Sequence, residues 1–430
     1  MKKILFITYM FPPIAGSGIQ RSLKFIKYLP EFGIEPIVFA PETAFWKAYD
    51  SKNLELPYLK NTKIYRCGIK KLVRYYDLRF GKGLAKHPHF YHLALKYIWF
   101  IDFFSSWYFE CKKTALNIAI EEQVDGFFTT SPPHSVHLFG IYLQRKLNKP
   151  WLMDLRDAMV DDPNKSLSGI AKSMNRFLEY FYEKKYYAAS SAITTVSQPI
   201  MDSMALRHRK IPLSDKTHII TNGFDESDFD DKKRNRSSGK RMTVTYTGAF
   251  LSQHTPEHFL KSIEQLISQK RVDPDRLLFR FVGYFDQKNM AIFSRFSESV
   301  PIEVIPFQPY DRVLQYQLDS DLLLLIVSLN AEQGGNHIYT GKFFEYIGAK
   351  RPIFALAPDG PLKTTIEAGR FGTVAPPKDL SGIVSGFKSV YDRWLENCDL
   401  PYDGDLAMRE RFTRKRLTRK LATIFYHHFS

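Results

Sequence analysis

The chain begins with two short, continuously apolar runs separated by a segment of helical periodicity. The first run is ILFITYMF, residues 4–11, and the second is IEPIVFA, residues 34–40. Between them, apolar residues recur at helical spacing from Ile19 to Leu29, and Pro30 follows. A strand without polar alternation is typical of a sheet covered on both faces, and a strand–helix–strand unit implies parallel pairing. The start of the chain therefore predicts a parallel sheet between two layers of helices.

The same alternation of strand and helix continues along the 430 residues. Further strands are predicted at residues 125–131, 150–155, 191–197, 217–223, 243–249, 277–285, 302–307, 321–327 and 352–357. A polar run at residues 225–241 divides the series, and the chain is too long for one core. We predict an α/β protein with two Rossmann-like, open parallel-sheet domains, residues 1–220 and 221–404. A C-terminal segment, residues 405–430, is expected to pack a helix over 408–429 back towards the first domain.

The chain is strongly basic, with a formal net charge of +16 and a pI near 9.4. This balance predicts an anionic partner, which could be nucleic acid, an acidic lipid surface or a phosphorylated ligand. Residues 63–86 contain eight Lys or Arg and one Asp, and the aromatic stretch 97–109 follows. These segments suit an anionic membrane interface, or else a solvated face beside a buried aromatic helix. No nucleic-acid recognition motif is visible, so no nucleic-acid partner is expected.

The cysteines and histidines of the chain predict neither a disulfide framework nor a metal site. Cys67, Cys111 and Cys398 are odd in number and widely spaced, which is typical of a reducing compartment. The segment HPHFYH, residues 87–92, lacks further ligands at zinc spacing. The longest apolar stretch, 97–109, is shorter than the roughly 20 residues that span a bilayer. We expect a cytoplasmic protein, with peripheral attachment to the inner face of the membrane as a further option.

A glycine-rich turn joins the first predicted strand to the helix after it. The segment PPIAGSGIQR covers residues 12–21, and Gly16, Ser17 and Gly18 stand where the helix begins. Glycines there would let backbone N–H groups approach an anion at the helix N-terminus. Arg21 occupies the place of the third glycine in the dinucleotide-binding pattern, so that fingerprint is not met. The turn is either an anion-binding loop or a tight connection.

Two further groups of polar residues follow predicted strands of the first domain. His134, in TTSPPHSVH, could orient or polarise a substrate hydroxyl, because imidazole both donates and accepts hydrogen bonds. Asp154 and Asp157 flank Arg156, whose guanidinium could hold both carboxylates, and the group could bind hydroxyls or supply a base. The alternatives are a surface histidine that caps a helix and a structural network of ion pairs.

The segment GGNHIYTGKFFEYIGAKRPI, residues 334–353, places a carboxylate in a largely apolar helix. Glu345 there costs free energy unless something hydrogen-bonds it. The spacing from Gly335 to Gly341 and Lys342 is one residue longer than that of a P-loop, and a glycine-rich loop entering a helix favours a diphosphate. A carboxylate one turn later suits a diol, such as that of a ribose. The alternative is a carboxylate satisfied by a neighbouring helix or a buried lysine.

Together these segments resemble the retaining glycosyltransferases of the GT-B fold, of the family 4 (glycosyl group 1) type. The resemblance runs in order through nearly the whole chain, in ILFITYMFPPIAGSGIQR, TTSPPHSVHLFG, PWLMDLRDAMVDDP, ITTVSQPI, IITNGFDESDF, TVTYTGAF, RFVGYF and TGKFFEYIGAKRPIFAL. The family pattern E-x(7)-E sets its first glutamate on the transferred sugar and its second on the ribose. Glu345 matches the second, whereas His337 stands at the first. The family's basic pair is absent from TGAFLSQHTPE, residues 247–257.

The resemblance implies two Rossmann-like domains that face an interdomain cleft. It implies metal-independent transfer of a hexosyl-type sugar, with retention, from a nucleotide-diphosphate sugar (a UDP-sugar favoured) to a cell-surface glycan or lipid-linked acceptor, without a cofactor. On this basis His134, Asp157 and Lys342 are assigned to catalysis, and Gly16, Ser17, Gly18, Arg156, Gly248, His337, Tyr339, Thr340, Gly341 and Glu345 to substrate binding. The departures at His337 and at the basic pair favour an alternative, a catalytically degenerate scaffold in polysaccharide assembly.

Overall fold

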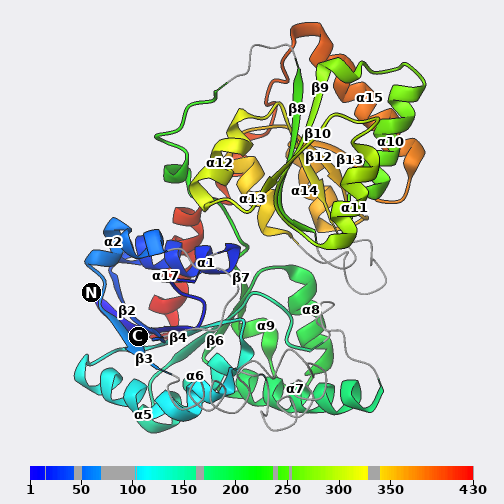
Figure 1. The fold of residues 1–430 in the computed structure, drawn as a ribbon. Coiled ribbons are helices and arrows are strands. Elements are labelled where there is room, and N and C mark those ends of the chain that lie inside the picture. The colour runs from blue at the N-terminus through cyan, green and yellow to red at the C-terminus, as the bar shows by residue number, and fades with distance from the viewer. Residues whose placement is uncertain are drawn as a thin grey trace, which may run out of the picture. The chain divides into compact units, whose positions relative to one another are not determined.

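The computed structural model of the chain divides into two compact units (Figure 1). Unit 1 comprises Met1–Thr221 and Leu417–Ser430, and unit 2 comprises Asn222–Arg416. The structure describes residues 1–14, 16–42, 51–68, 102, 104–160, 169–235, 241–250, 254–327 and 339–429. Each unit is built on one parallel sheet, and each is described by itself below.

The sheet of unit 1 has seven parallel strands in the order β3-β2-β1-β4-β5-β6-β7. The strands are β1 (Lys2–Thr8), β2 (Ile34–Pro41), β3 (Ile64–Cys67), β4 (Gly126–Ser131), β5 (Trp151–Leu155), β6 (Ala192–Thr195) and β7 (Thr217–Ile219). The helices around it include α1 (Ser17–Tyr28), α2 (Pro57–Lys60), α5 (Ser105–Glu121), α6 (His137–Leu147), α7 (Gly169–Ala189), α8 (Gln198–Arg207), α9 (Leu213–Lys216) and α17 (Arg414–His428). The strand order reverses its direction at β1 and β4, the topological switch point at which open α/β sheets bind ligands.

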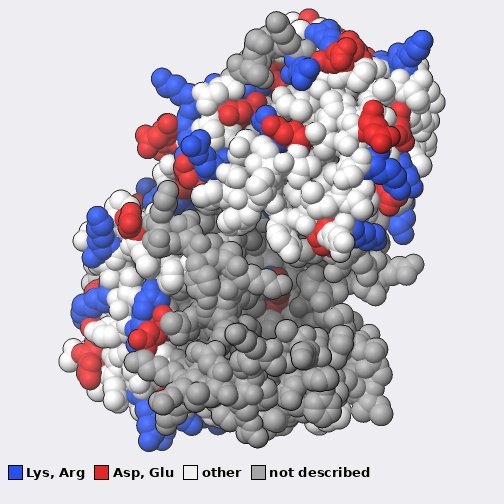
Figure 2. Space-filling model, in the orientation of Figure 1, with Lys and Arg blue, Asp and Glu red and all other residues white. Residues whose placement is uncertain are grey.

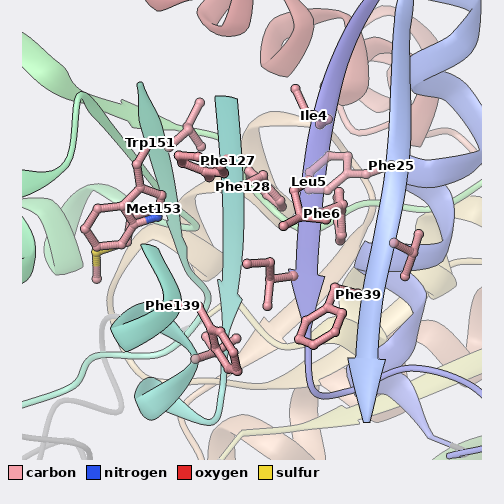
Figure 3. Packing of buried hydrophobic residues seen from close by; sticks show 14 of the residues in the cluster. Ile4, Leu5, Phe6, Phe25, Phe39, Phe127, Phe128, Phe139, Trp151 and Met153 are labelled. Atoms are coloured by element: carbon pink, nitrogen blue, oxygen red, sulfur yellow. The ribbon is translucent and has the colours of Figure 1, made fainter. Parts of the chain in front are cut away.

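Apolar strands bury both faces of this sheet, as the absence of polar alternation predicts. On one face Phe128 packs against Phe25 of α1, with ring centroids 6.2 Å apart (Figure 3). Phe128 also packs against Phe425 of α17, at 5.8 Å. On the other face Phe39 packs against Trp107 of α5 and Phe139 of α6, at 5.5 and 5.7 Å. Helices therefore cover both faces, and aromatic residues, which make up 15% of the chain, contribute to the core on each side.

The sheet of unit 2 has six parallel strands in the order β10-β9-β8-β11-β12-β13. The strands are β8 (Met242–Phe250), β9 (Leu277–Phe285), β10 (Ile302–Pro306), β11 (Leu322–Ile326), β12 (Ile353–Leu356) and β13 (Gly372–Ala375). The helices are α10 (Glu257–Ser268), α11 (Gln287–Phe296), α12 (Tyr310–Asp319), α13 (Gly341–Gly348), α14 (Pro361–Ala368), α15 (Leu380–Asn397) and α16 (Leu406–Glu410). Here the switch point lies at β8 and β11.

Successive residues of β11 serve the two different cores of unit 2. Leu322 and Leu324 belong to the cluster that includes residues of α10, α11 and α15, whereas Leu323 and Leu325 belong to the one that includes residues of α13 and α14. This alternation is the period of two of a strand, with apolar residues on both sides. The predicted fold class is confirmed: every strand expected from the sequence is present, within a few residues at its ends.

Three details differ from the sequence-based expectations. The short strands β3 and β13 were not predicted, because their sequences, IYRC and GTVA, are mostly half-buried and lack a continuous apolar run. The helix expected over 408–429 is two helices, α16 and α17, interrupted where Thr413 forms a β-bridge with Phe224. Its predicted apolar stripe from Leu417 to Phe425 is buried in the core of unit 1.

The expectation of no disulfide is also wrong, because Cys67 at the end of β3 is bonded to Cys111 of α5. Their Cα atoms lie 6.0 Å apart although 44 residues separate them in sequence. Cysteine count and spacing cannot reveal a pair that only the packing of α5 beside β3 brings together. Cys398 lies outside this disulfide, and its sulfur accepts a hydrogen bond from Nη2 of Arg276 at 3.2 Å.

Two surface properties bear on the expected partners. No helix in the described part of the chain is long and apolar enough to cross a membrane. Lys and Arg are interspersed with Asp and Glu over the described surface of unit 2 on the face in Figure 2. The net charge of +16 is therefore not concentrated as a basic patch on the described surface of that face. The basic and aromatic segment proposed for a membrane lies largely outside the described residues, in 69–101 and 103.

Candidate functional site

The candidate site in unit 2 lies where β8 ends at the switch point of its sheet. Gly248 pairs with Gly283 of β9, and their φ angles are +128° and +152°, which L side chains rarely adopt. A Cβ on Gly283 would stand 1.8 Å from the carbonyl oxygen of Gly248. A Cβ on Gly248 would stand 2.2 Å from Cε of Lys342. The two glycines therefore let the backbone of β8 and the lysine of α13 approach closely.

Lys342 stands in the first turn of α13, with its ammonium held at an aromatic ring. Its Nζ lies 5.3 Å from the ring centroid of Tyr246, and no carboxylate among the described residues pairs with it. Burial lowers the pKa of Lys342, while Tyr346 and Glu345 oppose that shift. Lys342 is half-buried, and a partly desolvated cation without a carboxylate partner is costly, so this arrangement fits an anionic ligand.

Glu345 follows one turn later on α13 and is half-buried with few partners. Its Oε2 accepts a hydrogen bond of 3.2 Å from Nε2 of Gln317 on α12. Burial raises the pKa of the Glu345 carboxyl to about 7, against the opposing influence of Gln317, Lys342 and Arg414. The carboxyl therefore changes charge near neutral pH. As a carboxylate it could accept hydrogen bonds from two neighbouring hydroxyls, as a diol requires.

A buried polar network holds Glu345 in place. Gln317 is fully buried, and its Nε2 also donates to Thr247 Oγ1 at 3.0 Å. The backbone N–H of Thr247 donates to the hydroxyl of Tyr346 at 3.0 Å, and that hydroxyl donates to the carbonyl oxygen of Leu324 at 3.2 Å. The network thus joins α12, α13, β8 and β11, and it orients the Glu345 carboxylate. The sequence identified Glu345 but not the residues that hydrogen-bond it.

The N-terminus of α13 completes this group of residues. Thr340 is its N-cap residue, but the threonine side chain makes no capping hydrogen bond. The first N–H groups of a helix lack intrahelical partners, and the helix dipole there favours negative charge. The hydroxyl of Tyr339 contacts Thr365 Oγ1 at 2.7 Å and is thereby tied to α14. Predicted Tyr339, Thr340, Gly341, Lys342 and Glu345 thus cluster with Gly248; His337 lies outside the described residues.

The described part of the loop after β8, which begins at residue 254, brings one ionisable side chain, His254, near Lys342. His254 is half-buried, and burial together with the charge of Lys342 lowers its pKa. Its imidazole is therefore neutral at pH 7, since the ordinary value already lies below neutrality. The described residues of this loop therefore add no cation at neutral pH to Lys342 of α13.

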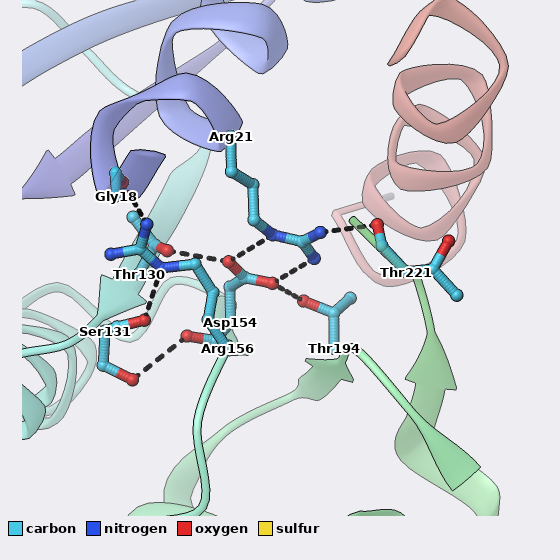
Figure 4. Close-up of polar contacts among 8 residues, drawn as sticks. All are labelled: Gly18, Arg21, Thr130, Ser131, Asp154, Arg156, Thr194 and Thr221. Carbon is cyan, nitrogen blue, oxygen red and sulfur yellow. Dashed lines mark hydrogen bonds and ion pairs between the residues drawn. The ribbon is translucent and has the colours of Figure 1, made fainter. Parts of the chain in front are cut away.

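In unit 1, the predicted arrangement around Arg156 is wrong, because a different arginine holds Asp154. Arg21 of α1 donates from Nε and Nη2 to the Asp154 carboxylate at 3.0 and 2.7 Å (Figure 4). Thr130 and Thr194 each donate to the same carboxylate at 2.7 Å. Burial alone would raise the pKa of Asp154, but Arg21 and the two hydroxyls outweigh it and hold the pKa below its ordinary value. The Asp154 carboxylate therefore accepts four hydrogen bonds from within the protein. Its role is structural: it holds α1 against β4, β5 and β6.

Arg156 instead binds backbone carbonyl oxygens. It donates to Ser131 at 2.7 Å, to Pro132 at 3.3 Å and to Gly18 in the first turn of α1 (Figure 4). These contacts fix the loop after β4 against the glycine turn after β1. Asp157 is exposed. Sequence adjacency suggested one Asp–Arg–Asp group, but only Asp154 lies in β5, and Arg156 and Asp157 follow the end of the strand at Leu155, so the three side chains do not form one group.

The remaining predicted residues of unit 1 lie at the carboxyl ends of β1 and β4. Gly16 and Gly18 are at the start of α1, and a Cβ on either would meet nothing within 4 Å. Ser17 is the first residue of α1. His134 is buried in a 3₁₀ turn, so it is not the surface histidine considered as an alternative.

Neither unit presents a metal cluster in the part of the chain that is described. No group of three or more His, Cys, Asp or Glu there could hold a metal ion. The histidine-rich segment 87–92 lies outside the described residues. The residues that the sequence missed are Arg21, Thr247, Gln317 and Tyr346; each acts through partners far away in the chain, so no local motif marks it.

The sequence matches neither a protein-family model nor a curated protein. Its structure is similar to that of the Anabaena protein HepE in complex with UDP and glucose, with a TM-score of 0.65 and 13% identity over 99% of this chain and 100% of that one. Sucrose-phosphate synthase from Thermosynechococcus elongatus gives 0.63 and 12% over 100% and 99%. The lipopolysaccharide outer core galactosyltransferase WaaB gives 0.55 and 14% over 99% of both chains. At these identities the likeness shows the fold, which is GT-B.

Proposed function

We propose that the chain is a retaining glycosyltransferase that moves a sugar from a nucleotide-diphosphate sugar to a glycan or lipid-linked acceptor. A UDP-sugar is favoured, because HepE was solved with UDP and with UDP-glucose. The observation that carries the proposal is the pairing of Lys342 and Glu345 on successive turns of α13, beside Gly248 at the switch point. A cation and a carboxylate one turn apart match a diphosphate and the diol of the ribose next to it.

In this assignment the diphosphate meets Lys342 and the N-terminus of α13. The ammonium, which lacks a carboxylate partner among the described residues, would neutralise the negative charge that develops on the leaving group. Glu345, oriented by Gln317, would accept hydrogen bonds from the ribose hydroxyls. Tyr339, Thr340 and Gly341 would contact the donor around the start of the helix.

The acceptor is assigned to unit 1, to the loops that carry Gly16, Ser17, Gly18, His134 and Asp157. The acceptor hydroxyl oxygen would bond to the anomeric carbon as the bond to the diphosphate breaks on the same face, and the hydroxyl proton would pass to a diphosphate oxygen. His134 and Asp157 would orient the acceptor hydroxyl, and Arg156 would hold the turn in position through Gly18. The chemistry assigned to these residues needs no metal or cofactor.

A second candidate function is a catalytically degenerate scaffold in polysaccharide assembly. It is favoured by the loop after β8, whose described residues bring no cation at neutral pH because the pKa of His254 is lowered. Such a protein would bind nucleotide or glycan without turnover.

Turnover distinguishes the two candidates. A thermal-shift screen of UDP-, GDP-, CMP- and dTDP-sugars identifies the donor, and proton NMR of that donor with the full chain follows its hydrolysis or transfer. The enzyme should release the nucleoside diphosphate and first form a sugar product of retained anomeric configuration, and Lys342→Met should remove this activity while Lys378→Met leaves it. A donor that binds but is never cleaved would support the scaffold, and an inverted product would refute retention.

A further inference from the structure

The described surface of unit 1 has an unusual concentration of exposed aromatic and apolar side chains on α7. Phe177 is 70% exposed, and Met174, Tyr180 and Phe181 are between 41% and 48% exposed. Met174, Phe177 and Phe181 recur at helical spacing, so they share one face of the helix. Soluble proteins leave such side chains exposed singly, whereas a continuous apolar stripe on a helix marks a contact surface.

On α7 the basic side chains are exposed beside this stripe, whereas the acidic ones are buried. Lys184 and Lys185 continue the exposed side by one further turn, and Arg176 is exposed as well. The ammonium of Lys185 lies 4.0 Å from the ring centroid of Phe181. Both glutamates of the helix, Glu179 and Glu183, are at least 95% buried. The solvent side of α7 is therefore apolar and basic, without an exposed carboxylate.

Internal pairing keeps the negative charge of α7 away from solvent. Glu183 accepts hydrogen bonds from Arg207 at 2.8 and 3.0 Å and from His208 at 2.8 Å. Its hydrogen bond from Tyr187, at 2.8 Å, occupies the same carboxylate from α7 itself. Glu179 accepts a hydrogen bond from Asn175 one turn earlier. A carboxylate locked into the core in this way does not repel an anionic surface outside.

The end of α8 extends the same chemistry. Tyr180 stacks on His208 with centroids 4.7 Å apart, and its hydroxyl contacts the carbonyl oxygen of Arg207 at 3.5 Å, so α8 ends beside α7 (Figure 1). Leu206 there is 65% exposed, and Arg209 and Lys210 are exposed too. The exposed carboxylate of α8, Asp202, lies one turn before Leu206 and accepts a hydrogen bond from Gln198. Among the described residues of α7 and of the end of α8, exposed basic side chains thus outnumber exposed acidic ones.

We propose that this face of α7 is an interfacial lipid-binding surface, which places Phe177 and Phe181 in the headgroup region of a bilayer that carries anionic lipid. An amphipathic helix with aromatic residues on one side and Lys or Arg around them lies in the plane of such an interface. Long basic side chains bury their methylenes there and keep the charge among the headgroups. The charge sorting favours an anionic lipid surface over a second copy of this net-positive chain, which the basic residues would repel. The inference is independent of the proposed donor site.

Vesicle flotation of the full chain tests this surface without any nucleotide. Wild type should float with phosphatidylcholine vesicles that contain about one third phosphatidylglycerol, and much less with phosphatidylcholine alone. Phe177→Ser with Phe181→Ser, and separately Lys184→Glu with Lys185→Glu, should each lower the vesicle-bound fraction about tenfold. The matched controls, Leu406→Ser and Lys288→Glu, change an exposed leucine and an exposed lysine of unit 2 and should leave flotation unchanged.

Circular dichroism and light scattering separate the possible outcomes. The four α7 substitutions affect exposed residues, so the variants should keep the helix content of wild type. Flotation that does not depend on lipid charge, or that survives both pairs of substitutions, would overturn the proposal. So would a dimer of wild type that the Phe177 and Phe181 substitutions dissociate without any change in flotation.

Discussion

The side chain of Lys342 occupies the space that a Cβ atom on residue 248 would need. Such an atom would stand 2.2 Å from Cε and 3.0 Å from Nζ of the lysine. Gly248 also has a φ of +128°, in the region that L side chains rarely adopt. The glycine at the end of β8 therefore determines where the ammonium of α13 lies.

Gly248→Ala should destabilise the protein by about 1–3 kcal/mol and weaken donor binding, because it strains the backbone and displaces Lys342. Urea unfolding measures the first effect. Truncating the lysine as well removes the clash but not the strain, so Gly248→Ala with Lys342→Ala should lose less stability than the two single changes added together. Gly18→Ala, which meets no atom within 4 Å, is the control for stability. A Gly248→Ala protein as stable as wild type would contradict this account of the glycine.

Donor affinity should rise with pH through neutrality. The pKa of Glu345 is raised to about 7, so the carboxylate that accepts from a diol is the minor form at about pH 6 and the major form at about pH 8. UDP-glucose itself has no group that titrates in this range. Calorimetry should show tighter binding of UDP-glucose at the higher pH in wild type and no such dependence in Glu345→Gln. The same slope in both proteins would exclude Glu345 as its source.

The same titration has the opposite effect on folding. A carboxyl whose folded-state pKa is raised binds more protons when folded than when unfolded, so its contribution to stability falls as pH rises from its ordinary range to about 7. Without ligand, Glu345→Gln should therefore lose less stability than wild type across that range. Urea unfolding at several pH values checks the sign, and Glu367→Gln, at an exposed glutamate of α14, is the control.

Removing the amide that orients Glu345 should shift the pH dependence of binding. In Gln317→Leu the carboxyl loses its hydrogen bond from Nε2, which favours the charged form, so the pKa of Glu345 should rise further. The midpoint of UDP-glucose affinity against pH should move to more alkaline values, whereas a purely structural role would weaken binding equally at every pH. Gln315→Leu, on the same helix, should leave the midpoint in place.

Asp154→Asn should destabilise unit 1 without acting on the donor site proposed in unit 2. It removes the charge that Arg21 needs while the guanidinium stays buried, and breaking a buried ion pair from one side costs about 3–5 kcal/mol. Because the pKa of Asp154 is held below its ordinary value, its contribution is present above that value and is lost as pH falls through the folded-state pKa. Acid unfolding of the variant should therefore be less steep than that of wild type. Unchanged stability of the Asp154→Asn variant would show that the anchor carries no net energy.

The sequence predicted the fold well because buried parallel strands leave a strong local signal. Continuous apolar runs such as those at β1 and β2 can be recognised without any partner. The strands β3 and β13 could not be, since IYRC and GTVA contain no such run and each strand forms by pairing with the strand beside it. The disulfide between Cys67 and Cys111 was missed for the same reason.

The candidate site was predictable in part, through residues that break a local rule. Glu345 is conspicuous as a charge among Phe343, Phe344 and Tyr346, and Gly248 ends a strand. A glutamine in a polar helix such as α12 is ordinary, so the sequence gives no reason to single out Gln317. Only tertiary packing brings it to Glu345. The prediction for Arg156 was wrong because its sequence neighbour Asp154 suggested an ion pair between the two. The ion-pair partner of Asp154 is Arg21, 133 residues away in sequence.

The central claim, that the Glu345 carboxylate binds the ribose diol, is tested most directly by a cycle that changes both partners. Calorimetry at about pH 8 would measure UDP and 2′,3′-dideoxyuridine diphosphate against wild type and Glu345→Gln. We predict that losing the carboxylate and losing the diol each weaken binding about tenfold or more, and that the two losses together cost little more than either alone. Additive losses, or equal affinity of UDP for wild type and Glu345→Gln, would contradict the claim.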